Sequence, residues 1–310
     1  MKALLSALAL LFFPQRTQED TVSLRFGWPE TGKCEVFEEV AKKGMEATMR
    51  YDLYWAPLTG DEEGLLLEYR DFRFIEFNGM DATTPQARRA LAQATAMGSA
   101  IPRMKIGPDG ALFGFEDYDK MVRELMEHFE TRGDAKEEIE ALGQLLGQPQ
   151  LQQVMKTKSA EIWNHWVSSW VGDVVRGTGE VWELDMEATG GVLPELHIQY
   201  GKLEEYRGVE CIEVSLTGQA DEEVFRRKLL QMLGLMSPDA EELPEDAPIS
   251  RATKTLTVEG ILAVEGLRPL EIQTSDVTKI WDAESGRVQP QEEEHTYYFD
   301  WPGIEPHGQN

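Results

Sequence analysis

The chain has 310 residues, and 41% of them are apolar, which is enough for a sizeable core in one large β domain or two smaller ones. Its 30 Lys and Arg residues are outnumbered by 56 Asp and Glu residues, so the formal net charge is −26. So negative a chain repels nucleic acid and anionic membrane surfaces, and we expect neither as a partner.

The first residues predict an export signal peptide. Lys2 is followed by an apolar run, Ala3–Phe13, and then by an abrupt change to polar residues. The run is too short to span a bilayer as a helix, which takes about 20 residues. We therefore expect residues 1–16 to be a signal peptide, and the mature protein to be periplasmic or extracellular with no transmembrane segment. The alternative, in which this run is an apolar first strand of the fold, stays open.

Alternating apolar residues predict antiparallel strands in the first part of the chain. Thr21–Trp28 and Met45–Trp55 place apolar side chains at every second position, and Leu65–Phe77 follows as a further strand. Gly27–Lys33 also has the spacing of a phosphate-binding loop. However, Cys34 stands where Ser or Thr would hold Mg²⁺, and the next residues are acidic, so we interpret the segment as a hairpin turn.

The middle of the chain is predicted to be helical. A short helix opens at Thr84-Pro85 and ends near Gly98, because Pro suits a first helical turn and Gly favours a stop. A hairpin over Arg103–Phe115 separates it from two further predicted helices, Glu116–Arg132 and Ala135–Leu146.

A long helix is predicted over Gln148–Gly172, between two β-rich parts of the chain. It carries Trp163, Trp166 and Trp170 at the spacing of three to four residues that places side chains on one helix face. This stripe has two interpretations: it packs into the core, or it forms one wall of a pocket for an apolar ligand. On the second interpretation the three tryptophans are the candidate ligand-binding residues.

The last part of the chain returns to strands, predicted over Val209–Leu216, Ile249–Val264, Leu270–Trp281 and His295–Trp301. The expected fold class is therefore α+β, with long antiparallel β-meanders that form curved sheets or half-barrels and a central group of helices packed across them.

This pattern divides the mature chain into two β halves and a tail. We expect an N-terminal β half with the helical middle at residues 17–175, and a C-terminal β half at residues 176–303 packed with the first as one unit. Residues 304–310 are expected to form a loose tail.

Cys34 and Cys211 are the two cysteines, one in each half. Export would permit a disulfide between them, which in the chain-entropy model would stabilise the fold by about 5 kcal/mol. The alternative is that both are small buried residues in strands.

Motifs for catalysis are missing. No G-x-S-x-G, H-E-x-x-H, C-x-x-C or G-x-G-x-x-G occurs, and no two of the five histidines have metal-ligand spacing. The sequence thus predicts no catalytic residue, no metal ligand and no cofactor. An enzyme stays an alternative, because acidic residues are too numerous for a catalytic pair to be recognised without distances.

In its layout of long amphipathic strands with helices across them, the exported chain resembles the bacterial half-barrel carriers, typified by the outer-membrane lipoprotein carrier and its relatives. In those families a curved sheet closed by helices encloses an apolar cavity for acyl chains. The resemblance concerns the layout of the whole mature chain and involves no motif and no single residue. It implies a soluble, non-catalytic protein that binds a lipid or another apolar molecule. The alternative is a structural or partner-binding protein of the cell envelope whose interior is solidly packed.

Overall fold

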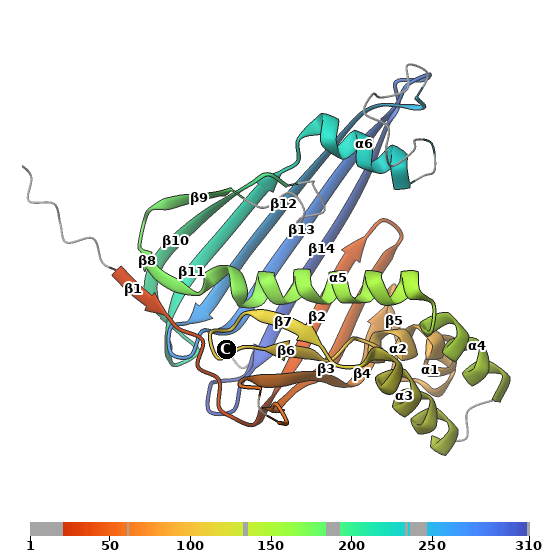
Figure 1. Ribbon diagram of the computed structural model, residues 1–310, viewed down its shortest axis with the longest axis horizontal. Helices are drawn as coiled ribbons and strands as arrows, with labels where there is room; N and C mark the ends of the chain where they lie inside the picture. Colours follow the sequence, from red (N-terminus) through yellow and green to blue (C-terminus); the bar gives the residue numbers. More distant parts are fainter. Residues whose placement is uncertain are drawn as a thin grey trace, which may run out of the picture.

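The structure, a computed structural model, describes residues 21–60, 62–132, 136–183, 193–232, 235 and 247–308. Within these ranges the chain is an α+β protein, as predicted, built on one 12-stranded antiparallel sheet that is not closed into a barrel (Figure 1). The predicted signal peptide, residues 1–16, lies outside the described residues.

The strands of this large sheet follow one path of neighbouring pairs. In pairing order they are β7 (Leu112–Phe115), β6 (Met104–Ile106), β4 (Leu65–Phe77), β3 (Met45–Pro57), β2 (Gly32–Lys42), β14 (Val288–Asp300), β13 (Arg268–Asp282), β12 (Ile249–Ala263), β11 (Val209–Gln219), β10 (Glu195–Tyr206) and β9 (Gly179–Glu183). The two-residue strand β5 (Met80–Asp81) pairs with β4, and β1 (Thr21–Leu24) forms a separate two-stranded sheet with β8 (Gly172–Val175).

One face of the large sheet carries the core. In β3 the residues at every second position from Ala47 to Trp55 are buried, as the alternation predicts. The last strand of the chain, β14, pairs with the early strand β2, so that Tyr298 lies opposite Phe37. This single pairing joins strands from both predicted β halves in one continuous sheet.

The helices lie on the core face and at one edge of the sheet. They are α1 (Pro85–Ala90), α2 (Ala92–Ser99), α3 (Tyr118–Arg132), α4 (Lys136–Leu146), α5 (Pro149–Trp166) and α6 (Glu222–Met232). Helix α5 crosses the sheet, whereas α1 to α4 gather beside β4 (Figure 1). Within the described ranges, no helix is both long enough and apolar enough to pass through a membrane.

Helix α5, which carries Trp163 and Trp166, is shorter than the helix predicted over Gln148–Gly172. It ends at Trp166 because Val167 leaves helical geometry, with φ −138° and ψ −60°. Trp170 lies instead in a 3₁₀ turn, η1 (Ser168–Trp170). Gly172 does not end the helix but begins β8, where its φ of 151° suits a residue without a side chain.

The core beneath α5 is dense in aromatic rings. Trp163 packs edge-on against Trp28 at 5.4 Å between ring centroids, and Trp166 packs edge-on against Phe299 at 5.0 Å. Such edge-to-face pairs add to the free energy of burial by about 1 kcal/mol each. Interdigitated rings therefore hold the helix to β14 and to the segment between β1 and β2.

The predicted disulfide is not formed. Cys34 and Cys211 are both free and buried. Cys34 lies on β2 and Cys211 on β11, and β14, β13 and β12 lie between these strands in the sheet. Because neighbouring strands are about 4.8 Å apart and a disulfide needs Cα atoms within about 7 Å, this placement keeps the two thiols apart. The alternative stated from the sequence, two small buried residues in strands, describes them correctly.

Candidate functional site

The three tryptophans proposed from the sequence lie together in the core, and all are completely buried. The indole N–H of Trp163 donates to the Gly110 carbonyl at 2.9 Å, and that of Trp170 donates to the His165 carbonyl at 2.7 Å. None of the three lines either of the two surface cavities described below. The packing agrees with the first interpretation of the stripe, and a ligand-binding role for these tryptophans stays a prediction.

A large cavity opens instead at the edge of the sheet, along β4. Its volume is about 900 Å³, and we call it the β4 cavity. Along this edge of β4, Leu65–Leu67 pair with β6 and Glu76–Phe77 pair with β5. Between them, in the part of the chain that the structure describes, the edge of β4 from Glu68 to Ile75 has no strand beside it. All the residues of this unpaired stretch, from Glu68 to Ile75, line the cavity.

Helices form the other walls of the β4 cavity. Arg88, Leu91, Ala92, Thr95 and Ser99 line it from α1, α2 and the residue between them. Their spacing of three or four residues places them along one face of this helical segment. Helix α3, which packs in one hydrophobic cluster with α2, contributes Met121, Glu124 and Leu125.

An irregularity in β4 supplies part of the apolar lining. Asp71 and Phe72 both lie opposite Tyr51, because the pairing of β4 with β3 shifts at this point. Asp71 has a φ of 55°, a left-handed conformation that is uncommon for a residue with a side chain. Phe72 stacks on Tyr51 at 5.9 Å, with 17° between the ring planes. Further apolar lining residues are Tyr69, Phe74, Ile75, Leu91, Ile101, Met121 and Leu125.

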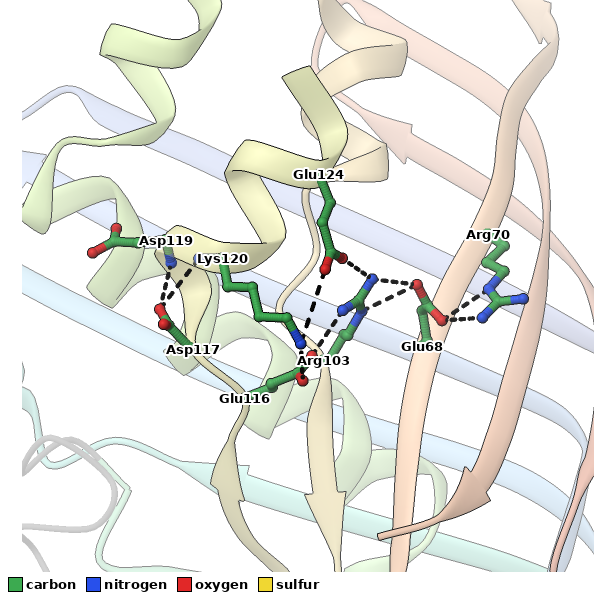
Figure 2. Close-up of polar contacts among 8 residues, drawn as sticks. All are labelled: Glu68, Arg70, Arg103, Glu116, Asp117, Asp119, Lys120 and Glu124. Carbon is green, nitrogen blue, oxygen red and sulfur yellow. Dashed lines mark hydrogen bonds and ion pairs between the residues drawn. The ribbon is translucent and has the colours of Figure 1, made fainter. Parts of the chain in front are cut away.

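The polar wall of the cavity is a network of ion pairs around Arg103 (Figure 2). The Arg103 guanidinium donates to Glu68 at 2.9 Å, to Glu116 at 2.8 Å and to Glu124 at 2.7 Å. Lys120 also donates to Glu116, at 3.1 Å. One side chain thereby ties β4, the start of the α3 segment and α3 itself together at the rim of the cavity.

Burial and the neighbouring charges shift the pKa values of Arg103 and Glu116 in opposite directions. Burial alone would lower the pKa of Arg103, but its hydrogen bonds to Glu116 and Glu124 and the charge of Glu68 raise that pKa above its ordinary value. Conversely, burial would raise the pKa of Glu116, and the hydrogen bonds from Arg103 and Lys120 lower it. Arg103 and Glu116 therefore both favour their charged forms.

Tyr69 also lines the cavity, but its side chain packs against Trp166 and its hydroxyl is buried in the core near Glu38. The residue is only 6% exposed, and its hydroxyl has no hydrogen-bond partner among the described residues. Burial raises the pKa of Tyr69, so that it stays a neutral donor. A buried hydroxyl without a partner costs the fold about 1–3 kcal/mol.

The second cavity, of about 550 Å³, lies on the opposite face of the sheet, across β10 to β13. Its lining is polar and acidic, with Glu213, Glu259 and Glu271 among the residues that border it. Within the described ranges, no group of three or more His, Cys, Asp or Glu residues is arranged to hold a metal ion. Its polar and acidic lining also distinguishes this cavity from typical small-molecule sites, whose walls are mainly apolar.

A third feature is a polar cluster under α5. His295 Nδ1 lies 2.8 Å from a Glu38 oxygen, and its Nε2 lies 3.1 Å from a Glu293 oxygen. Glu38 also accepts hydrogen bonds from the Tyr51 and Tyr297 hydroxyls. None of these five residues lines either cavity. We therefore assign the cluster to the stability of the fold.

None of the residues that line the β4 cavity was predicted from the sequence to be a site residue. The available local signals were the helix start at Thr84-Pro85 and the break near Gly98, which position two of its walls. Arg103 and its three acidic partners have no characteristic spacing along the chain, so they come together only in the folded protein.

Comparison with known proteins gives little further information. No protein family matches the chain, and a search of curated proteins finds no match. Among solved structures, the chain is similar to one described as "Lipid-protein interactions in lipovitellin", with 10% sequence identity and a TM-score of 0.41. The similarity covers 90% of this chain but only 25% of the lipovitellin chain.

Proposed function

We propose that this protein binds an apolar small molecule, such as a lipid with one acyl chain, in the β4 cavity. The observation that carries the proposal is the cavity itself, whose 900 Å³ falls within the range of about 300–1,000 Å³ typical of small-molecule sites. Ten of its twenty lining residues are apolar and ten are polar or charged, so the cavity is more polar than most small-molecule sites and suits a ligand with both an apolar and a polar part. The proposed role is binding and not catalysis.

The location of the protein is part of the proposal. The charged start and apolar run of residues 1–16 support export to the periplasm or the cell exterior. A soluble binding protein in that compartment agrees with what the resemblance to half-barrel carriers implies. A lipid or another apolar molecule is then the expected partner.

A second candidate function is a structural or partner-binding role in the cell envelope. The observation in its favour is the complete burial of Trp163, Trp166 and Trp170, which leaves the space between α5 and the sheet filled. On this view the β4 cavity would hold only water. The two functions are distinguished by ligand uptake.

The test fills the cavity without disturbing the core. Ala92 is exposed on α2 and lines the β4 cavity, whereas Ala94 is exposed on the same helix and does not line it. The Ala92→Trp and Ala94→Trp variants and the unmodified protein would be titrated with an uncharged fluorescent fatty alcohol. Native mass spectrometry would give the stoichiometry.

We expect the unmodified protein and the Ala94→Trp variant to bind one molecule per chain with equal affinity. The Ala92→Trp variant should bind at least about tenfold more weakly, because the indole occupies the site. Absence of uptake by the unmodified protein, or equal uptake by both variants, would overturn the proposal and favour the structural role.

A further inference from the structure

Two arginines on the walls of the β4 cavity form no ion pair with any described residue. They are Arg73 on β4 and Arg88 on α1, and both are exposed. The other two lining arginines, Arg70 and Arg103, are neutralised by Glu68 and by the acids around Arg103. The chain has a net charge of −26, so two positive charges without acidic partners at one cavity are unusual for this protein.

Arg88 belongs to the helix face that lines the cavity. It stands three, four and seven residues before Leu91, Ala92 and Thr95, which line the same wall. The preceding and following positions on α1, Ala87 and Arg89, do not line the cavity. The position of Arg88 on the helix therefore places it toward the cavity.

No acidic residue described near Arg73 or Arg88 forms an ion pair with either of them, so both guanidinium groups can bind a ligand. Arg88 lowers the pKa of Asp81 through its charge, but the main cause of that shift is the hydrogen bonds from Thr83, whose hydroxyl and N–H donate to one Asp81 oxygen at 2.6 Å and 2.8 Å. Among the described residues that line the cavity, Asp71 is the one acid outside the Arg103 network. Arg73 lies opposite Arg50 in the sheet, and Arg50 pairs with Glu35.

We propose that the ligand of the β4 cavity is a single-chain amphiphile with an anionic head group, and that Arg73 and Arg88 bind this head group. The inference rests on the proposed function and adds the class of ligand to it. A guanidinium presents a planar pair of N–H donors that matches a carboxylate or a phosphate. The acyl chain lies along the apolar wall that includes Phe72, Leu91 and Leu125.

The experiment compares ligands that differ only in the head group. Palmitate, hexadecanol and a lysophosphatidate with the same chain would each displace the uncharged fluorescent fatty alcohol from the full-length protein. The variants are Arg73→Gln, Arg88→Gln and, as the matched control, Arg89→Gln. Arg89 is exposed on the same helix, does not line the cavity and donates from Nε to the Pro85 carbonyl.

We expect the unmodified protein to prefer an anionic ligand over hexadecanol by about tenfold, and this preference should shrink with added salt. Arg88→Gln and Arg73→Gln should each weaken the binding of the anionic ligand and leave hexadecanol unchanged. Arg89→Gln should change neither. Tighter binding of palmitate identifies a carboxylate head, and tighter binding of the lysophosphatidate identifies a phosphate head.

Two results would overturn the inference. In the first, palmitate, the lysophosphatidate and hexadecanol bind the unmodified protein equally, in which case the cavity binds apolar molecules without regard to charge and the proposed function survives. In the second, the anionic ligands bind preferentially but neither Arg73→Gln nor Arg88→Gln weakens them. If no ligand binds at all, the proposed function fails together with the inference.

Discussion

The imidazole of His295 on β14 lies 2.8 Å from the carboxylate of Glu38 on β2, across the strand pairing that joins the start of the chain to its end. Glu38 is buried, and the His295 side chain is 23% exposed. Burial would lower the pKa of His295, but hydrogen bonds to Glu293 and Glu38 raise it to about 9. The charged imidazolium thus helps to hold these two strands together.

The first prediction concerns alkaline pH. Because the folded pKa of His295 exceeds its ordinary 6.5, its contribution to stability is complete below pH 6.5 and is lost as the pH rises through about 9. We expect the free energy of unfolding to fall by about 2 kcal/mol in this range, with allowance for partial exposure. Urea unfolding of the unmodified protein and of His295→Gln at about pH 6 and about pH 10 measures this, and a fall of equal size in both would contradict it.

The second prediction concerns the Arg103 network. Replacement of Arg103 by Gln leaves Glu68, Glu116 and Glu124 close together without their shared cation, so we expect a loss of about 2–3 kcal/mol. The matched control is Arg123→Gln, an exposed position on α3. Thermal unfolding gives the stability, and amide exchange should show α3 opening more often. Unchanged exchange in α3 would mean that the network does not hold this helix.

The third prediction concerns the contact of α2 with β4. A Cβ atom at Gly98 would overlap the Phe72 ring, so Gly98→Ala should destabilise the protein by about 1–3 kcal/mol. In α4, a Cβ at Gly143 would make only ordinary contacts with Met126, and Gly143→Ala should be neutral or stabilising by up to about 1 kcal/mol. Chemical denaturation compares the two, and equal effects would refute the predicted clash.

The fourth prediction separates two buried tryptophans. Trp163 donates from its indole N–H to the Gly110 carbonyl, whereas the buried indole N–H of Trp166 has no partner among the described residues. Replacement by Phe removes a similar volume from both sites. It removes a hydrogen bond only at Trp163, so Trp163→Phe should cost about 1 kcal/mol more than Trp166→Phe. Urea midpoints measure this difference, and the reverse order would contradict it.

The fifth prediction concerns the cysteines. Burial raises the pKa of Cys211 to about 11 and also raises that of Cys34, so both thiols are inert in the folded protein. Without reductant, a thiol reagent should label neither residue in the native state and both after unfolding in urea. Labelling that requires prior reduction would restore the disulfide rejected above.

Local patterns were sufficient where one or two residues determine the backbone. Helix α1 begins where predicted, because the Thr84 hydroxyl accepts from the Ala87 N–H and Pro85 stands in the first turn. Strand β3 was predicted from its alternation. Strand β14 was predicted to begin at His295, but it begins at Val288. The sequence did not indicate the earlier start, because the residues before His295 are exposed and show no alternation of apolar and polar side chains. Their pairing with β13 extends the strand.

The sequence by itself determined the α+β class, the strong strands and the helix starts, because these depend on side-chain periodicity and on Pro, Gly and capping residues within a few positions. Only the tertiary structure decided that β2 pairs with β14, that Cys34 and Cys211 are separated by three strands, and that β4 lacks a neighbour from Glu68 to Ile75. Each of these features depends on which distant segments of the chain pair with one another. Local residue spacing cannot predict that pairing. The β4 cavity and its arginines follow from the same long-range pairing.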